Sequence, residues 1–400
     1  MISSDGWEGR FDRFLEPFLG AWRFKTRRKW GQVYLRGLLL PGERKSIEPL
    51  AERVAPGHDQ ELRHFVSESD WDDQAVEAVL WEKVDAAVGG DDSFLIIDDT
   101  ALPKKGAESV GVAHQYCGAL GKQANCQSLV SFTLAKHDVP MPLSLPLYLP
   151  EAWATDAKRR SKVGVPEHVV FREKWRIALD EVKRLRKGGV RFQTVLADAG
   201  YGVCGELRKE LSSLGLLWAV GVLPNQRAYP AHATTRMPRP SPRGGNRRKH
   251  AVASHVDRKA ADIIAALGKS AFRAVKWRDG TKGPLRARFA ACRVRLTDGE
   301  KAAHGKGLPG DEVWLVCEQR SDERRYYVTN HPPDTTLYDL AFAIKARWSC
   351  EQVHQQLKEE LGLDHFEGRS WRGLHHHALL TMIAFVFLQR ERLNENKAAA

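Results

Sequence analysis

The sequence lacks several patterns that define common protein classes. Its six cysteines include no Cys-x-x-Cys pair and no zinc-ligand spacing, so neither a disulfide framework nor a structural zinc site is expected. Its longest apolar stretch, residues 378–388, is too short to cross a bilayer. The first residues show neither the basic nor the apolar segment of a signal peptide. We therefore expect a cytoplasmic protein with no membrane partner.

Acidic residues are scarce in one part of the chain. Between residues 211 and 295 there are 18 Lys and Arg residues against three acids, a net charge of +15. The whole chain carries +12, so the remainder sums to −3. Basic charge gathered in one segment is typical of a protein that contacts a polyanion.

The spacing of apolar residues divides the chain into four parts. Residues 1–90 have helical spacing and are expected to form a separate helical domain, to which the family resemblance described below assigns DNA binding. Residues 91–223 alternate strands and helices, with strands expected at 93–98, 127–135, 141–149, 192–197 and 217–222 and helices at 167–187 and 203–214. Residues 224–325 are a basic insertion, a Pro- and Arg-rich arm followed by β-strands. Residues 326–395 return to helix, with one long helical stretch expected at 334–362.

This order of elements predicts a mixed α/β sheet with helices on its faces. Two further strands and then a helix lie in the sequence between the strand at 93–98 and the strand at 192–197. If these two strands are parallel neighbours, their carboxyl ends emerge at the same edge of the sheet.

Three acidic residues occupy places from which they can reach one point. Asp98 and Asp198 each follow a short apolar strand, and Glu351 lies in the long helical stretch. A cluster of carboxylates is the ligand set that Mg²⁺ requires, and two such ions about 3.5–4 Å apart can act on a phosphodiester. Asp99 competes with Asp98, because neighbours on a strand point to opposite faces. Only one of the two is therefore expected to be a ligand, and the match to a family motif described below favours Asp98, with Asp99 as the fallback.

Several cations accompany these acids. Helical spacing puts Arg347, Glu351, His354 and Lys358 on one stripe, where the cations can hold phosphates on either side of the carboxylate. The alternative is an ordinary solvent-exposed helix face with no role in DNA binding. Further candidate DNA contacts are Lys104, Lys105, Arg243, Arg247, Arg248 and Lys249, although solvation explains the first two equally well. The Gly-rich stretch 118–122 lacks the full Walker spacing, so no nucleotide cofactor is expected.

The residues around the three acids resemble the motifs of DDE transposases. Asp98-Asp99-Thr100 resembles the Asp-x-Ser/Thr of the first catalytic strand, and Asp198-Ala199-Gly200-Tyr201 resembles the second motif, Asp-x-Gly-Tyr. Arg347, Glu351 and Lys358 match the Tyr-x2-Arg-x3-Glu-x6-Lys pattern of one group of bacterial insertion-sequence transposases, with Ile344 in place of the tyrosine. The resemblance extends to residues 36–39, 62–65, 71–72 and 362–371.

This resemblance implies an RNase H-like core and a transposase that cleaves transposon ends and joins the 3′-hydroxyl to target DNA. It implies two Mg²⁺ ions on Asp98, Asp198 and Glu351, with Mn²⁺ as a substitute. The expected partners are double-stranded DNA, as terminal inverted repeats and target, and a second copy of the chain in a homodimer or higher assembly. We expect the bound protein to associate with the nucleoid. Two alternatives remain: an RNase H-like nuclease without strand transfer, and a transposase-derived DNA-binding protein.

Overall fold

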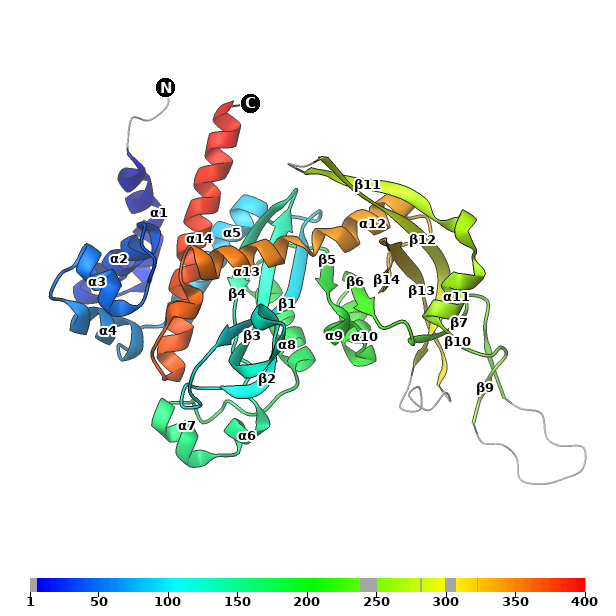
Figure 1. The fold of residues 1–400 in the computed structure, drawn as a ribbon, viewed down its shortest axis with the longest axis horizontal. Helices are drawn as coiled ribbons and strands as arrows, with labels where there is room; N and C mark the ends of the chain where they lie inside the picture. Colours follow the sequence, from blue (N-terminus) through cyan, green and yellow to red (C-terminus); the bar gives the residue numbers. More distant parts are fainter. Residues whose placement is uncertain (1–5, 238–249, 281–282, 299–306, 322, 400) are drawn as a thin grey trace, which may run out of the picture. The chain divides into compact units, whose positions relative to one another are not determined.

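The computed structural model describes residues 6–237, 250–280, 283–298, 307–321 and 323–399 (Figure 1). The chain forms two compact units, residues 1–192 with 348–400 and residues 193–347. The arm residues Arg243, Arg247, Arg248 and Lys249 lie outside the described residues. The four-part division expected from the sequence stays a prediction.

Helices from both ends of the chain build one core in the first unit. The N-terminal helices are α1 (Trp7–Ala21), α2 (Lys25–Leu39), α3 (Ile47–Val54), α4 (Asp59–Ser67) and α5 (Asp73–Val88), and the C-terminal helix is α14 (Trp371–Ala399). Phe11 and Phe14 of α1 pack against Phe387 of α14, with ring centroids 5.0 and 5.4 Å apart. Helices α2, α4 and α5 also contact α14. The N-terminal helices therefore share their core with α14.

Two buried histidines of α14 form hydrogen bonds with other segments of the first unit. His376 Nδ1 lies 3.0 Å from the carbonyl oxygen of Val66. His377 Nε2 lies 3.0 Å from the Gly362 carbonyl oxygen, and its Nδ1 lies 2.8 Å from the Tyr34 hydroxyl. Because a carbonyl only accepts hydrogen bonds, His377 carries its proton on Nε2 and Tyr34 donates to Nδ1. Burial lowers the pKa of His376 to about 3 and that of His377 to about 4, so both rings are neutral near pH 7.

The first unit also holds an antiparallel group of strands. These are β1 (Phe94–Pro103), β2 (Ala113–Cys117), β3 (Lys122–Lys136) and β4 (Val139–Ser144), with β3 pairing the other three. Helices α6 (Glu151–Ala154), α7 (Ala157–Val163) and α8 (Lys174–Lys187) follow. The expectation that the first strand ends at Asp98 is wrong. The register with β3 continues to Pro103 opposite Cys126, because Thr100, Ala101 and Leu102 are buried as well.

The second unit is a mixed sheet with helices. Its strands are β5 (Thr194–Ala197), β6 (Leu217–Val222), β7 (Arg227–Pro230), β10 (Arg258–Lys259), β11 (Arg273–Gly280), β12 (Gly283–Asp298), β13 (Leu308–Gln319) and β14 (Arg324–Thr329). They run in the order β10-β7-β12-β13-β14-β6-β5, and β11 pairs with β12. Only the β5–β6 pair among these is parallel. The strands of the basic insertion therefore extend the sheet that begins with β5 and β6.

Short elements complete the second unit. They are α9 (Ala199–Gly202), α10 (Gly205–Ser213), α11 (Ala260–Ala266), α12 (Leu337–Ala346) and the two-stranded pair of β8 (Thr235–Arg236) and β9 (Val252–Ala253). Helix α12 packs on the sheet through Lys345, whose ammonium donates to the buried Glu318 carboxylate at 2.9 Å and lies 4.6 Å from the centre of the Trp277 ring.

The single helix expected at 334–362 is two helices. Helix α12 ends at Ala346, and α13 (Ser349–Glu359) begins in the first unit. The Glu351 amide bonds the Trp348 carbonyl at 3.1 Å, three residues back rather than four. The α-helical hydrogen-bond ladder is therefore interrupted around Arg347 and Trp348. The prediction that Arg347 shares a continuous helix with Glu351 is wrong.

Candidate active site

Asp98 and Asp99 point in different directions from β1. Asp99 forms an ion pair with Lys174 of α8, with Oδ2 2.5 Å from Nζ. Asp98 instead accepts a hydrogen bond from the Cys350 thiol of α13, with Sγ 3.2 Å from Oδ2. Successive side chains of a strand alternate between faces, and here α8 and α13 each receive one of the two carboxylates. Of the two aspartates, Asp98 is the one bonded to the helix that carries Glu351.

A second contact joins α13 to the same point of β1. Ser131 of β3 lies directly opposite Asp98 in the register, and its hydroxyl donates to the Asp98 carbonyl at 3.2 Å. His354 Nε2 lies 2.6 Å from this hydroxyl oxygen. The tautomer of the His354 ring sets which of these two groups donates. Cys350 and His354, one helical turn apart, therefore dock α13 on the middle of β1.

Glu351 stands beside this docking contact in the first turn of α13. Its side chain is exposed, while Cys350 and Val353 are buried. An acid in the first turn of a helix is favoured by the helix dipole. Helix α13 thus brings one exposed carboxylate to the neighbourhood of Asp98, within one compact unit. Sequence reasoning missed Cys350 and Ser131, whose only signals are a place next to Glu351 and a place in an apolar strand.

Asp198 has a different environment in the second unit. It follows β5 directly, as expected, and caps α9: its Oδ1 accepts from the amides of Gly200 at 2.9 Å and Tyr201 at 3.3 Å. A side chain on Gly202 would not fit, since its Cβ would lie 1.9 Å from the Gly221 carbonyl oxygen of β6. The glycines of this turn let α9 approach β6 and hold Asp198 at the carboxyl end of β5.

The donor set fits a hard divalent cation in its chemistry. Asp98, Asp198 and Glu351 offer only carboxylate oxygens, the ligands that Mg²⁺ and Mn²⁺ take. Asp98 and Glu351 belong to the first unit and Asp198 to the second. Within the part of the chain that the structure describes, no three His, Cys, Asp or Glu side chains cluster closely enough to hold a metal ion. The complete triad therefore stays a prediction.

The cations predicted to contact DNA have varied surroundings. Lys105 is exposed, whereas the Lys104 ammonium donates to the Phe366 carbonyl at 2.6 Å. Burial lowers the pKa of both Lys104 and Lys358, and the Asp364 carboxylate opposes this shift in each case. His354 is bonded to Ser131, as described above. Arg347 caps the C-terminal end of α12.

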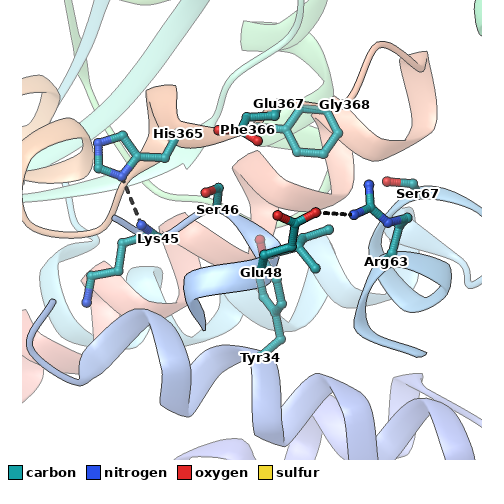
Figure 2. Close-up of a pocket in the computed structure, with 11 residues that line it drawn as sticks. Tyr34, Lys45, Ser46, Glu48, Arg63, Ser67, His365, Phe366, Glu367 and Gly368 are labelled. Atoms are coloured by element: carbon teal, nitrogen blue, oxygen red, sulfur yellow. Dashed lines mark hydrogen bonds and ion pairs between the residues drawn. The ribbon is translucent and has the colours of Figure 1, made fainter. Parts of the chain in front are cut away.

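Four segments of the chain meet in a small pocket of the first unit (Figure 2). Arg63 of α4 pairs with Glu48 of α3 at 3.1 Å. The Lys45 amide donates to His365 Nδ1 at 3.1 Å, and the Lys45 ammonium donates to the carbonyl of Leu38 at 2.9 Å. Burial, and secondarily the Arg53 charge, lower the pKa of Lys45 to about 8. The hydrogen bond from the Lys45 amide to His365 therefore links the loop after α13 to the chain segment between α2 and α3.

The comparisons with known proteins agree with these observations. A family model described as DDE superfamily endonuclease matches residues 17–284. The chain belongs to the DDE superfamily endonuclease family. The matched range of this DDE endonuclease model contains Asp98 and Asp198 and ends before Glu351. None of the described helices is long and apolar enough to cross a membrane.

A curated relative and a solved structure each match part of this chain. It is 30% identical, over 184 residues, to the "Probable transposase for insertion sequence element IS701" of Microchaete diplosiphon. That match covers 46% of each protein, so the chain spans about half the length of this curated relative. A solved structure, the NurA nuclease from Sulfolobus solfataricus, is 8% identical and covers 65% of this chain and 74% of its own, with a TM-score of 0.24. A score this low carries no argument about the fold.

Proposed function

We propose that the chain is a DNA transposase of a bacterial insertion sequence, with Asp98, Asp198 and Glu351 as its catalytic carboxylates. The observation that carries the proposal is the docking of α13 on β1, where Cys350 and His354 place the helix of Glu351 at Asp98. Family membership and the partial likeness to a probable insertion-sequence transposase support it.

The proposed reaction needs no covalent bond between protein and DNA. Asp98, Asp198 and Glu351 would hold two Mg²⁺ ions, which would supply charge stabilisation for the attacking and leaving oxygens of the phosphodiester. Lys358 and Arg347 position phosphates, and the N-terminal helices and the basic insertion hold the duplex. Joining two ends requires at least a homodimer.

Substitution of the helix carboxylate tests the proposal. Glu351→Gln removes one oxygen ligand and very little DNA-contacting surface, so we expect cleavage of terminal-repeat duplexes to be lost while binding is retained. Glu359→Gln is the matched control, since Glu359 is another exposed acid of α13, at its far end. Cleavage with Mg²⁺ or Mn²⁺, and little preference for Zn²⁺, would agree with the proposed oxygen ligands.

Three outcomes would redirect the proposal. If Glu351→Gln still cleaves in a preparation free of other nucleases, Glu351 has no catalytic role. If the wild type cleaves ends but never joins a pre-cleaved 3′-hydroxyl end to a target plasmid, the protein is a nuclease without strand transfer. Binding to terminal repeats without any cleavage would instead indicate a transposase-derived DNA-binding protein.

A further inference from the structure

The start of α2 carries the densest basic segment among the N-terminal helices. Five of the seven residues from Arg23 to Lys29 are Lys or Arg, and none is acidic. Arg23, Lys25, Arg28 and Lys29 are exposed, and Arg27 is half-buried. Phe24, between the first two cations, is 59% exposed. We call these five cations the α2 basic surface.

The α2 basic surface differs from the other cations of the same helices in its pairing. Three arginines of the N-terminal helices and their loops are neutralised by carboxylates: Arg36 by Asp12 at 2.8 Å, Arg44 by Glu367 at 2.6 Å and Arg63 by Glu48 at 3.1 Å. Within the described residues, no carboxylate forms an ion pair with any of the five cations of the α2 basic surface. None of the five is therefore neutralised by an ion pair, and Glu61, the acid that interacts with the Lys29 charge, is itself paired with His58.

Nearby rings and carbonyl groups hold several of these side chains in place without neutralising their charge. The Arg27 guanidinium lies 4.8 Å from the centre of the Phe24 ring, and the Lys29 ammonium lies 4.4 Å from that of Trp30. Arg28 Nε donates to the Trp22 carbonyl at 3.1 Å. Contacts with rings and carbonyls leave a cation its full charge.

The placement of these charges also costs helix stability. Helix α2 has no acidic residue in its first turn and no side-chain cap, and its first residues are basic. Cations near a helix N-terminus oppose the helix dipole. An arrangement that disfavours the helix itself is explained when the charges meet a polyanion outside the protein.

We propose that the α2 basic surface contacts the phosphate backbone of duplex DNA. The inference rests on the proposed function, which supplies DNA as the polyanion. Exposed Lys and Arg side chains neutralise phosphates, and such contacts position a protein on DNA without reading its sequence. The surface therefore holds terminal-repeat and unrelated duplexes equally.

Salt dependence of binding by the full chain tests this surface. Replacing Arg23, Lys25 and Lys29 with Gln should flatten the log–log salt slope by about 2.7, since each neutralised phosphate contributes about 0.9. The matched control replaces Arg36, Arg44 and Arg63 with Gln, which changes the net charge equally but removes cations already paired with acids. The control should leave the slope unchanged. Thermal unfolding confirms that both variants fold.

Each result supports or overturns the proposal. A flattened slope on both random and terminal-repeat duplexes, only in the α2 variant, supports it. Equal slopes in the α2 variant, the control and the wild type overturn it, as does loss of binding to anionic vesicles with DNA binding unchanged. Cleavage activity reports separately on the proposed function. If the wild type cleaves ends while the α2 variant keeps the wild-type salt slope, only the proposed role of the α2 basic surface is overturned.

Discussion

Two aspartates of the candidate site are held in opposite ways. Asp198 is fixed by its own neighbours, because amides two and three residues later bond its carboxylate. Asp98 is fixed by a helix more than 250 residues away in sequence, through the Cys350 thiol and the His354–Ser131 contact. One carboxylate depends on local backbone, and the other depends on tertiary packing. Substitutions should therefore affect the two through different observables.

The largest effect is expected at Asp98 itself. Asp98→Asn removes a metal ligand, and the loss of several kcal/mol of charge stabilisation corresponds to about a thousandfold slower cleavage. Asp99→Asn, the matched control one residue later, breaks only the partly exposed pair with Lys174 and should change stability by less than about 1 kcal/mol. Single-turnover cleavage rates distinguish the two. Loss of cleavage in Asp99→Asn alone would reverse the assignment.

Acid should weaken the first unit through its buried histidines. The pKa of His377 is about 4 in the folded protein and about 6.5 when exposed, so the unfolded state binds more protons between these values. The contribution of this one ring to the free energy of unfolding is fully present above pH 6.5. It falls by about 3 kcal/mol as the pH drops toward 4. Denaturant unfolding measured from pH 7 to pH 4 should show this slope, and His377→Gln should flatten it. An equal slope in His377→Gln would contradict the assignment.

The backbone support of Asp198 predicts a steric effect in the second unit. Gly202→Ala places a Cβ against the Gly221 carbonyl, so we expect a loss of about 1–3 kcal/mol in the free energy of unfolding. Gly118→Ala is the control, since nothing lies within 4 Å of a Cβ there. Urea unfolding measures both. A fully stable Gly202→Ala variant would show that α9 can shift away from β6.

The side-chain support of Asp98 predicts the smallest effect. Cys350→Ala removes one hydrogen bond to a carboxylate, and about 1.4 kcal/mol corresponds to tenfold slower cleavage. Because Cys350 acts through Asp98, the Mg²⁺ concentration for half-maximal cleavage should rise as well. Cys350→Ser keeps a donor and should recover most of both. If Cys350→Ala changes only thermal stability, the thiol is a packing residue.

The same contrast explains what the sequence could predict. The position of Asp198 after a strand follows from local signals: a short apolar run, then Gly200 in a turn. Strand alternation implies that only one of Asp98 and Asp99 is a ligand, and the choice of Asp98 comes from its match to the Asp-x-Ser/Thr motif. The continuation of β1 to Pro103 depends on its pairing with β3, and the break at Arg347 and Trp348 is not visible in helical periodicity. The roles of Cys350 and Ser131 arise from packing between segments that no local pattern connects.

Affinity cleavage by bound iron tests the central claim, that Asp98, Asp198 and Glu351 share one metal site. The protein is loaded with Fe²⁺ in place of Mg²⁺, and ascorbate and peroxide then cut the backbone beside the ion. The account predicts cuts near all three residues, suppressed by excess Mg²⁺ and abolished in Glu351→Gln. Cuts near Asp98 and Glu351 without any near Asp198, or the reverse, would contradict it.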